Sequence, residues 1–194
     1  GSDVGALDAA SVKYDDKGNA SGSWADENST YGAMVALVDL FRSSSASTNP
    51  SKAYYNYARP FRWSSDVQVL PTLVPAKQPD ANALSDGGYP SGHTNAAYLA
   101  SLALAYAAPE RFQAMLTSAS EIGNSRIVAG MHSPGDVIGG RILSTAVAAA
   151  ALNDPKNAAQ LTAARADAEA LLATPGTGAD AYADHDANAK LYTE

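Results

Sequence analysis

Three short motifs hold most of the side chains in this sequence that could do chemistry. In chain order they are Lys52-x6-Arg59-Pro60, Pro90-Ser91-Gly92-His93 and Ser125-Arg126-x5-His132-x3-Asp136. Together they supply three cations, two imidazoles, a serine hydroxyl, a helix-start backbone and one carboxylate. This inventory suits the binding of a tetrahedral oxyanion such as phosphate, with one imidazole attacking it and the other protonating the leaving group.

In the first motif, two cations stand seven residues apart. That spacing is almost two turns of a helix, so we expect Lys52 and Arg59 to project from one face of a helix that Pro60 ends. Taken alone, the pair is more typical of a solvated basic face. The flanking Trp63 and the tyrosines at 54, 55 and 57 could shape a substrate mouth, although aromatic residues at this spacing are more often core.

The second motif reads as a loop that turns into a helix. Ser91 is a natural N-cap, and Gly92 leaves room for a ligand to approach the free N–H groups of the helix start, which bind anions. His93 then lies in the first helical turn, beside whatever binds there. Taken alone, this tetrapeptide is more typical of an ordinary helix cap.

The third motif allows two interpretations of its carboxylate. Ser133-Pro134-Gly135-Asp136 is typical of a capping box, in which Asp136 only partners Ser133. Alternatively, Asp136 accepts the proton on one ring nitrogen of His132 and leaves the other nitrogen free to attack. The motif alone does not decide between them, but the joint occurrence of three motifs favours the functional interpretation.

The remaining histidine gives no convincing metal site. The chain has three histidines, and two of them lie in the motifs. Asp184-His185-Asp186 could bind a metal, but in an acidic tail this trio is more typical of a solvated segment. We therefore expect no metal and no cofactor.

Composition limits the classes of partner. The 194 residues and 19.9 kDa fit one domain with a sizeable core. The net charge of -7 and the pI of about 4.8 repel nucleic acid and anionic membranes, so an anionic substrate must be attracted by a local cation cluster. The absence of cysteine excludes disulfides, a catalytic thiolate and a zinc–thiolate site.

The hydrophobic pattern predicts an all-α fold, a compact irregular bundle of about six main helices. We expect a polar arm at 1–28, the catalytic domain at 29–174 and a low-complexity acidic tail at 175–194. The connection 61–89 is long for a compact domain, and we expect it to form a wall over the site. The expected helices cover 31–41, 48–58, 91–107, 109–130, 133–152 and 154–173. The first has an apolar stripe of Met34, Leu37, Val38 and Phe41, and the apolar face of the fourth is Phe112, Met115, Leu116, Ala119 and Ile122.

No transmembrane segment is expected. The longest apolar stretches, 96–108 and 145–152, are too short to span a bilayer. Gly1-Ser2 has the look of an expression scar, so we expect that a leader or a longer parent chain has been removed.

At these motifs the sequence resembles the type 2 phosphatidic acid phosphatase (PAP2) superfamily, and in particular the bacterial class A nonspecific acid phosphatases. The stretches 52–61, 89–94 and 125–136 match the three-part signature in full, and the likeness extends through 121–124 and Val137. It covers roughly 48–150 well and the flanks poorly.

The resemblance implies a PAP2/chloroperoxidase-like fold and a role for each motif residue. His132 would be the nucleophile that forms a phosphohistidine, His93 the general acid, and Asp136 the residue that orients His132. The phosphate-binding residues implied by the resemblance are Lys52, Arg59, Ser91, Gly92 and Arg126.

The resemblance further implies metal-independent hydrolysis of small-molecule phosphate monoesters, phosphotransfer to alcohols as a side reaction, inhibition by vanadate and a periplasmic or secreted location. Two alternatives stay open. A vanadium haloperoxidase uses the same pocket but is a much longer chain, and a phosphate-binding module would not need both imidazoles. The natural substrate, the pH optimum and formation of a homo-oligomer also stay open.

Overall fold

The computed structural model describes residues 27–173. The acidic tail, with Asp184-His185-Asp186, and almost all of the N-terminal arm therefore lie outside the described residues. Within the described range the chain is all-α, as predicted, and the only β feature there is an isolated antiparallel bridge between Ala58 and Gly87.

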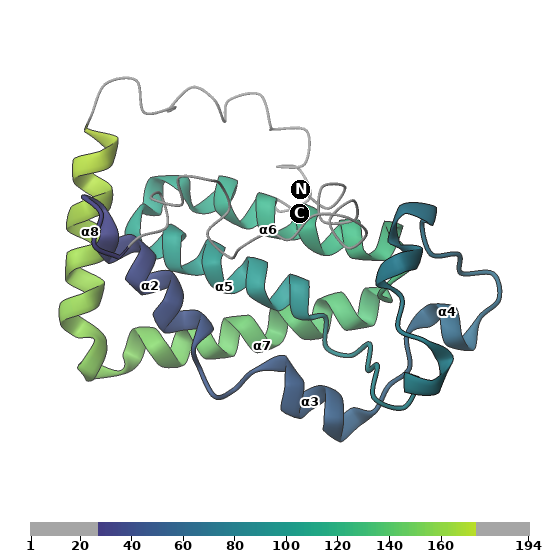
Figure 1. Ribbon diagram of the computed structural model, residues 1–194. Coiled ribbons are helices and arrows are strands. Elements are labelled where there is room, and N and C mark those ends of the chain that lie inside the picture. The colour runs from purple at the N-terminus through teal and green to yellow at the C-terminus, as the bar shows by residue number, and fades with distance from the viewer. Residues whose placement is uncertain (1–26, 174–194) are drawn as a thin grey trace.

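Three long helices form the body of the molecule, and α5 packs against both α6 and α7. Figure 1 shows α8 crossing one end of this body, beside α2, while the connection between α3 and α5 covers the other end. All six predicted helices are present, and a short helix, α4, lies in the connection. Their bounds are α2 (Gly32–Arg42), α3 (Thr48–Tyr55), α4 (Pro60–Trp63), α5 (Gly92–Ala107), α6 (Phe112–Val128), α7 (Pro134–Asn153) and α8 (Ala158–Leu172).

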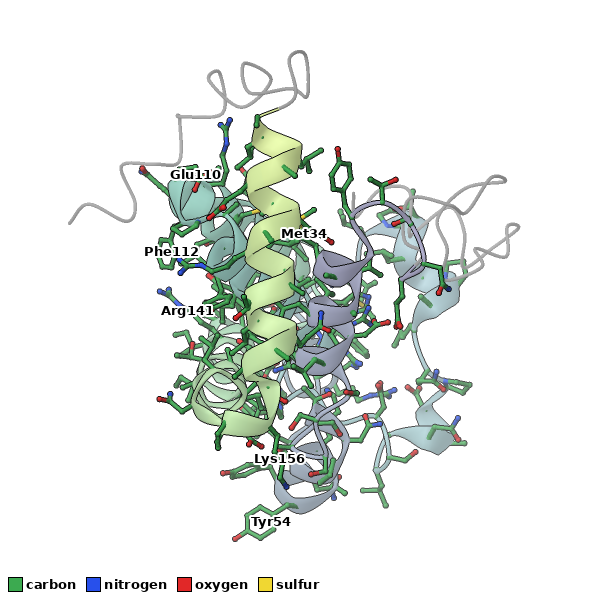
Figure 2. The ribbon with its side chains drawn as sticks, turned by 90° about the vertical axis from the view of Figure 1, so that its left-hand side faces the viewer. Met34, Tyr54, Glu110, Phe112, Arg141 and Lys156 are labelled. Atoms are coloured by element: carbon green, nitrogen blue, oxygen red, sulfur yellow. The ribbon has the colours of Figure 1, made fainter. Side chains whose placement is uncertain are left out.

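The main core lies where α2, α5, α7 and α8 meet. The predicted apolar stripe of α2 is confirmed, since Leu37 and Phe41 are fully buried and Met34 points from α2 towards α8 (Figure 2). Alanines on α5 and α8 let the helices approach closely. The buried members of this core are Leu37, Phe41, Leu99, Ala103, Ala107, Ala108, Val147, Ala148, Leu161, Ala164 and Ala168.

Helices α5 and α7 begin at the predicted caps. Ser91 Oγ accepts a hydrogen bond from the Thr94 N–H at 3.3 Å at the start of α5. At the start of α7, Ser133 Oγ accepts from the Asp136 N–H at 3.2 Å, and the Asp136 carboxylate accepts from the Ser133 N–H at 2.8 Å. This reciprocal pair is the predicted capping box.

The prediction for the first motif was wrong in one respect, because Arg59 does not lie on the helix of Lys52. Helix α3 ends at Tyr55, and Asn56 closes it in the left-handed conformation with φ 44°. Pro60 begins α4 instead of ending α3, and it keeps Arg59 extended with ψ 150°. The bridge between Ala58 and Gly87 holds the chain between the two helices in an extended conformation.

The predicted apolar face of α6 was only partly right. Ala119 is fully buried, but Phe112 and Ile122 are 51% and 42% exposed. The helix instead packs through its smaller residues: a side chain at Gly123 would lie 3.0 Å from Val137 Cγ1 on α7. Small residues of α6 therefore contact the neighbouring helix, because they allow closer packing than the large ones.

Helix α7 qualifies, by length and composition alone, as a membrane span. It has 20 residues and a mean hydropathy of 1.3, with 33% of its most apolar window buried. Of this helix, the sequence-based expectation counted only 145–152 as apolar, which is shorter than the 20-residue helix. Core helices of soluble proteins pass the same test, and α7 packs against α5 and α2 and carries Asp136.

Candidate active site

The three motifs meet at one end of the bundle, where α5 and α7 begin and α6 ends (Figure 1). The connection 61–89 lies against the turn between α6 and α7, as its Leu70 N–H donates to the Ala129 carbonyl at 3.2 Å. A small second core of Leu73, Ala129 and Met131 forms beneath it. The expected wall therefore packs directly beside His132.

His132 is positioned by a tight turn at the end of α6. The N–H groups of Met131 and His132 both donate to the Arg126 carbonyl, at 3.2 and 3.1 Å. Gly130 makes this turn with φ 70°, and a side chain there would collide with the Gln68 backbone. The turn sets the imidazole, only 3% exposed, beside Asp136 at the start of α7.

Asp136 forms the capping box of α7, and the same carboxylate faces His132. Its Oδ2 accepts from the Ser133 N–H at 2.8 Å and also lies 3.4 Å from His132 Nδ1. The second contact is too long and poorly aligned for a full hydrogen bond, and both His132 Nδ1 and Asp136 Oδ1 are otherwise without a partner. Such contacts commonly shorten when a substrate binds.

Arg59 settles the tautomer of His132. Its Nη1 lies 3.1 Å from His132 Nε2 and donates to the Met131 carbonyl at 3.0 Å. Because a guanidinium only donates, Nε2 must be the unprotonated nitrogen, and the ring proton lies on Nδ1, towards Asp136. This arrangement leaves an unprotonated nitrogen among cations.

The pKa values of this pair favour a neutral imidazole beside a charged carboxylate. Burial lowers the pKa of His132, and the charges of Arg59 and Lys52 lower it further, against the opposing effect of Asp136. Burial alone would raise the pKa of Asp136, but its contacts with His132 and Ser133 bring it below its usual value. His132 can therefore stay neutral in mildly acidic solution.

Arg126 is a buried cation without a carboxylate partner among the described residues. The residue is 7% exposed, and its Nε has no hydrogen-bond acceptor. Burial and the nearby charge of Arg59 lower its pKa. Because an uncompensated buried charge is costly, this guanidinium indicates a site that an anion would complete.

Lys52 reaches the site from α3 and contacts the segment before the second motif. Its Nζ donates to the carbonyls of Gly87 and Gly88, at 2.6 and 3.3 Å. Burial and the charge of Arg59 lower the pKa of Lys52 to about 8. Lys52 and Arg59 therefore belong to one cluster, although they do not share a helix.

The start of α5 supplies polar groups beside these cations. Ser91 is fully buried, and its Oγ accepts from both Thr94 Oγ1 and the Thr94 N–H, which leaves the Ser91 hydroxyl hydrogen to donate. A Cβ on Gly92 would meet only Thr48 Oγ1, at 3.6 Å, so the backbone here is open to a ligand. The Ser91 N–H donates to the Asp136 carbonyl at 2.8 Å and ties α5 to α7.

His93, in the first turn of α5, is the most accessible of the motif side chains. Partial burial lowers the pKa of His93 to about 4, together with the charges of Arg126, His132, Arg59 and Lys52. His93 therefore lies within the electrostatic influence of the cation cluster. An imidazole in this position would take up a proton readily only when an anion offsets the cations.

Two features of the site were not predicted. Asp86 binds Arg59, with 2.6 Å between Arg59 Nε and Asp86 Oδ1. Gly87 and Gly88 hold Lys52 through their carbonyls. Only the nearness of Asp86-Gly87-Gly88 to the second motif could have suggested this, because such contacts join residues far apart in the chain.

Two tyrosines of the predicted aromatic cluster, Tyr55 and Tyr57, line a cavity at the start of α7. The rings of Tyr55 and Tyr89 meet edge to face, with centroids 5.0 Å apart. Tyr54, by contrast, is 83% exposed and points away from the bundle (Figure 2). A cavity of about 310 Å3 is lined by Tyr55, Tyr57, Tyr89, Ser133, Gly135 and Asp136.

Comparison with known proteins finds relatives over the part of the chain that carries the three motifs. Residues 29–159 match the family model of the PAP2 superfamily. The non-specific acid phosphatase of Salmonella typhi is 40% identical over 95 residues, which is 48% of this chain and 35% of that protein. The protein of the same name from Salmonella typhimurium is 39% identical over 95 residues, with the same shares.

A more distant relative covers more of the chain. The non-specific acid phosphatase of Providencia stuartii is 30% identical over 119 residues, 61% of this chain and 45% of that protein. The chain therefore matches less than half the length of each of these relatives.

Proposed function

We propose that this chain, which belongs to the PAP2 superfamily, hydrolyses small-molecule phosphate monoesters through a phosphohistidine intermediate. The observation that carries the proposal is the setting of His132. Its unprotonated Nε2 lies beside Arg59, and its Nδ1 faces Asp136. The related non-specific acid phosphatases support the same reaction class.

Binding of the phosphoryl group would use the cation cluster. Lys52, Arg59 and Arg126 would neutralise the phosphoryl oxygens, which remain negative throughout transfer. The Ser91 hydroxyl and the Gly92 N–H would donate hydrogen bonds from the start of α5. Arg126 gains most from this binding, since its buried charge has no carboxylate partner among the described residues.

In the first chemical step, His132 Nε2 attacks phosphorus in line as the bond to the ester oxygen breaks. His93 gives its proton to that oxygen, and an alcohol leaves. Asp136 stabilises the positive charge that develops on His132. The low pKa of His93 in the free protein fits this role, because a bound phosphate dianion raises that pKa and makes proton uptake favourable.

In the second step, His93 is neutral and accepts a proton from water. The water attacks phosphorus, the bond between phosphorus and Nε2 breaks, and phosphate is released. An alcohol in place of this water would give phosphotransfer. Side-chain cations carry the charge stabilisation, so the reaction needs no metal, and residues 27–173 contain no group of three or more His, Asp or Glu that could hold one.

An assay with an aryl phosphate tests the proposal, with acid-labile labelling of the enzyme by 32P-labelled substrate. We expect turnover that survives excess EDTA, and label that is lost in His132→Ala. Phosphate binding without turnover would instead support a binding module, and activity that is lost on chelation and restored by a divalent ion would contradict the metal-free mechanism. Bromide oxidation by the vanadate-loaded protein would favour the haloperoxidase alternative.

We further infer that the protein acts in the periplasm or outside the cell, as its resemblance to the class A enzymes implies. Fractionation of the native host, with a cytoplasmic enzyme as marker, tests this location. Activity that stays with the cytoplasmic marker would contradict it.

A further inference from the structure

The segment 86–88, which ends one residue before the second motif, holds both cations of the first motif. Asp86 Oδ1 accepts from Arg59 Nε at 2.6 Å, and the carbonyls of Gly87 and Gly88 accept from Lys52 Nζ. These contacts link two parts of the chain that are separated by about thirty residues. The segment therefore connects the cation pair to the start of α5.

Asp86 is itself rigidly held. Its side chain is 5% exposed, and its Oδ2 accepts from Arg62 Nη2 at 3.0 Å. Arg62 is fixed in turn by the Gln78 carbonyl at 2.9 Å and by Asp80. A buried carboxylate is tolerated only when its oxygens are satisfied, and here one arginine satisfies each oxygen.

This arrangement determines where the Arg59 guanidinium points. Asp86 holds Nε, while Nη1 contacts the Met131 carbonyl and His132 Nε2. The guanidinium is planar, so fixing two of its nitrogens fixes the third. Nη2 has no partner among the described residues and is left for an oxyanion.

We propose that Asp86 is a positioning residue for the reaction: it orients Arg59 towards the phosphoryl group and towards the attacking nitrogen of His132. The inference rests on the proposed function, in which Arg59 is a phosphate ligand. It assigns Asp86 no contact with substrate. Its effect must therefore pass through Arg59, which makes the assignment testable.

The first test compares Asp86→Asn with Asp80→Asn. Asparagine offers one acceptor oxygen, so it cannot satisfy both Arg59 and Arg62. We expect kcat/KM for an aryl phosphate to fall about 100-fold, and inhibition by inorganic phosphate to weaken. Asp80 contacts the same Arg62 but its side chain is 89% exposed, so Asp80→Asn should change kcat/KM less than about twofold.

The direction in which Asp86→Asn changes the affinity for phosphate distinguishes a positioning role from a purely electrostatic one. If Asp86 acted only by offsetting positive charge, Asp86→Asn would tighten phosphate binding. Tighter binding, or a kcat/KM equal to that of Asp80→Asn, would overturn the proposal.

The second test is a double-mutant cycle with Arg59→Lys, which keeps a charge but lacks the planar fork. If Asp86 acts through Arg59, adding Asp86→Asn to Arg59→Lys should cost less than about threefold in kcat/KM, because the geometry is already lost. An additive loss would overturn the proposal, since a purely structural role would lower both backgrounds equally.

Phosphate binding, measured by calorimetry, keeps this inference separate from the proposed function. A wild-type protein without phosphatase activity would refute the proposed function. The positioning role would still be supported if Asp86→Asn weakens phosphate binding in the wild-type background and leaves it unchanged in the Arg59→Lys background. Asp86→Glu replaces Asp86→Asn if the latter does not fold, and a fall in kcat is again expected. A folded Asp86→Glu with wild-type kinetics would show that Asp86 only stabilises the fold.

Discussion

The two motif histidines occupy different surroundings, and single substitutions should reveal this. His132 is buried among Asp136, Arg59 and the end of α6, whereas His93 lies in an accessible first turn of α5. A nucleophile must form the covalent bond in every turnover, but a proton donor matters only when the leaving group needs a proton.

We therefore expect His132→Ala to lose at least about four orders of magnitude in kcat with every monoester. His93→Ala should recover part of its first step with dinitrophenyl phosphate, because dinitrophenolate leaves without protonation. Its second step still lacks a base, so phosphoenzyme should accumulate. Rapid quench with 32P-labelled substrate measures both effects.

These assignments have a clear counter-result. Label trapped on His132→Ala, or a phosphoenzyme rate in His93→Ala that is equally slow with good and poor leaving groups, would show that the roles are wrong. Far-UV circular dichroism of both variants controls for loss of fold.

The lowered pKa of Lys52 predicts that anion binding depends on pH. Its pKa, lowered to about 8 by burial and Arg59, means that the free enzyme loses one positive charge as the pH rises through about 8. Sulfate keeps the same charge across this range, so its competitive inhibition constant should rise between pH 7 and pH 9. A constant value would show that Lys52 keeps its proton or does not face the anion.

At the scale of elements, the position of α7 depends on glycines that allow α7 to approach the start of α5. A Cβ on Gly140 would lie 2.6 Å from the Ser91 carbonyl oxygen and 3.2 Å from the Asn95 nitrogen. These are backbone atoms that cannot move aside alone. The same contact brings Asp136 to Ser91, so helix packing and site geometry are coupled.

Gly140→Ala should consequently lower the free energy of unfolding by about 1–3 kcal/mol, the usual cost of overpacking. It should also reduce kcat/KM, because it separates α5 from α7. Gly135→Ala is the matched control on the same helix: its Cβ would meet only Ser133 Oγ, at 3.6 Å, so its stability should be unchanged or slightly higher. Urea denaturation measures both, and equal stabilities would contradict this account of the packing.

In the molecule as a whole, the cations of the cluster repel one another, and a bound anion reduces this repulsion. His93 has a pKa of about 4 in the folded protein against an ordinary value of 6.5, and the pKa of His132 is also lowered. The unfolded chain therefore binds protons in the window below 6.5 where the folded chain does not. By linkage, stability must fall as the pH decreases from about 6.5 towards 4.

In an anion-poor buffer, the midpoint temperature of thermal unfolding should therefore fall as the pH decreases from 6.5 to 4.5. Phosphate should raise it again, because phosphate binds only the folded state. His93→Ala lacks one of the two titrating groups and should lose less stability across the same window. Parallel pH curves for the wild type and His93→Ala, measured by calorimetry, would contradict this prediction.

Local sequence determined the features that depend on near neighbours in the chain. The helix starts at Ser91 and Ser133 were predictable because a cap and its partner N–H lie within three residues of each other. The all-α class and the apolar stripe of α2 follow from helical periodicity for the same reason. The candidate site residues were identified by residue type and order, and by the resemblance, without any coordinates.

Only the tertiary structure decided how those residues face one another. Arg59 lies outside the helix of Lys52 because Gly87, distant in the chain, pairs with Ala58 and holds this stretch extended. Asp86 became part of the site through its contact with Arg59, and large apolar residues on α6 stayed exposed because small ones pack more closely. Such contacts join segments far apart in sequence, and no local pattern encodes which of them will meet.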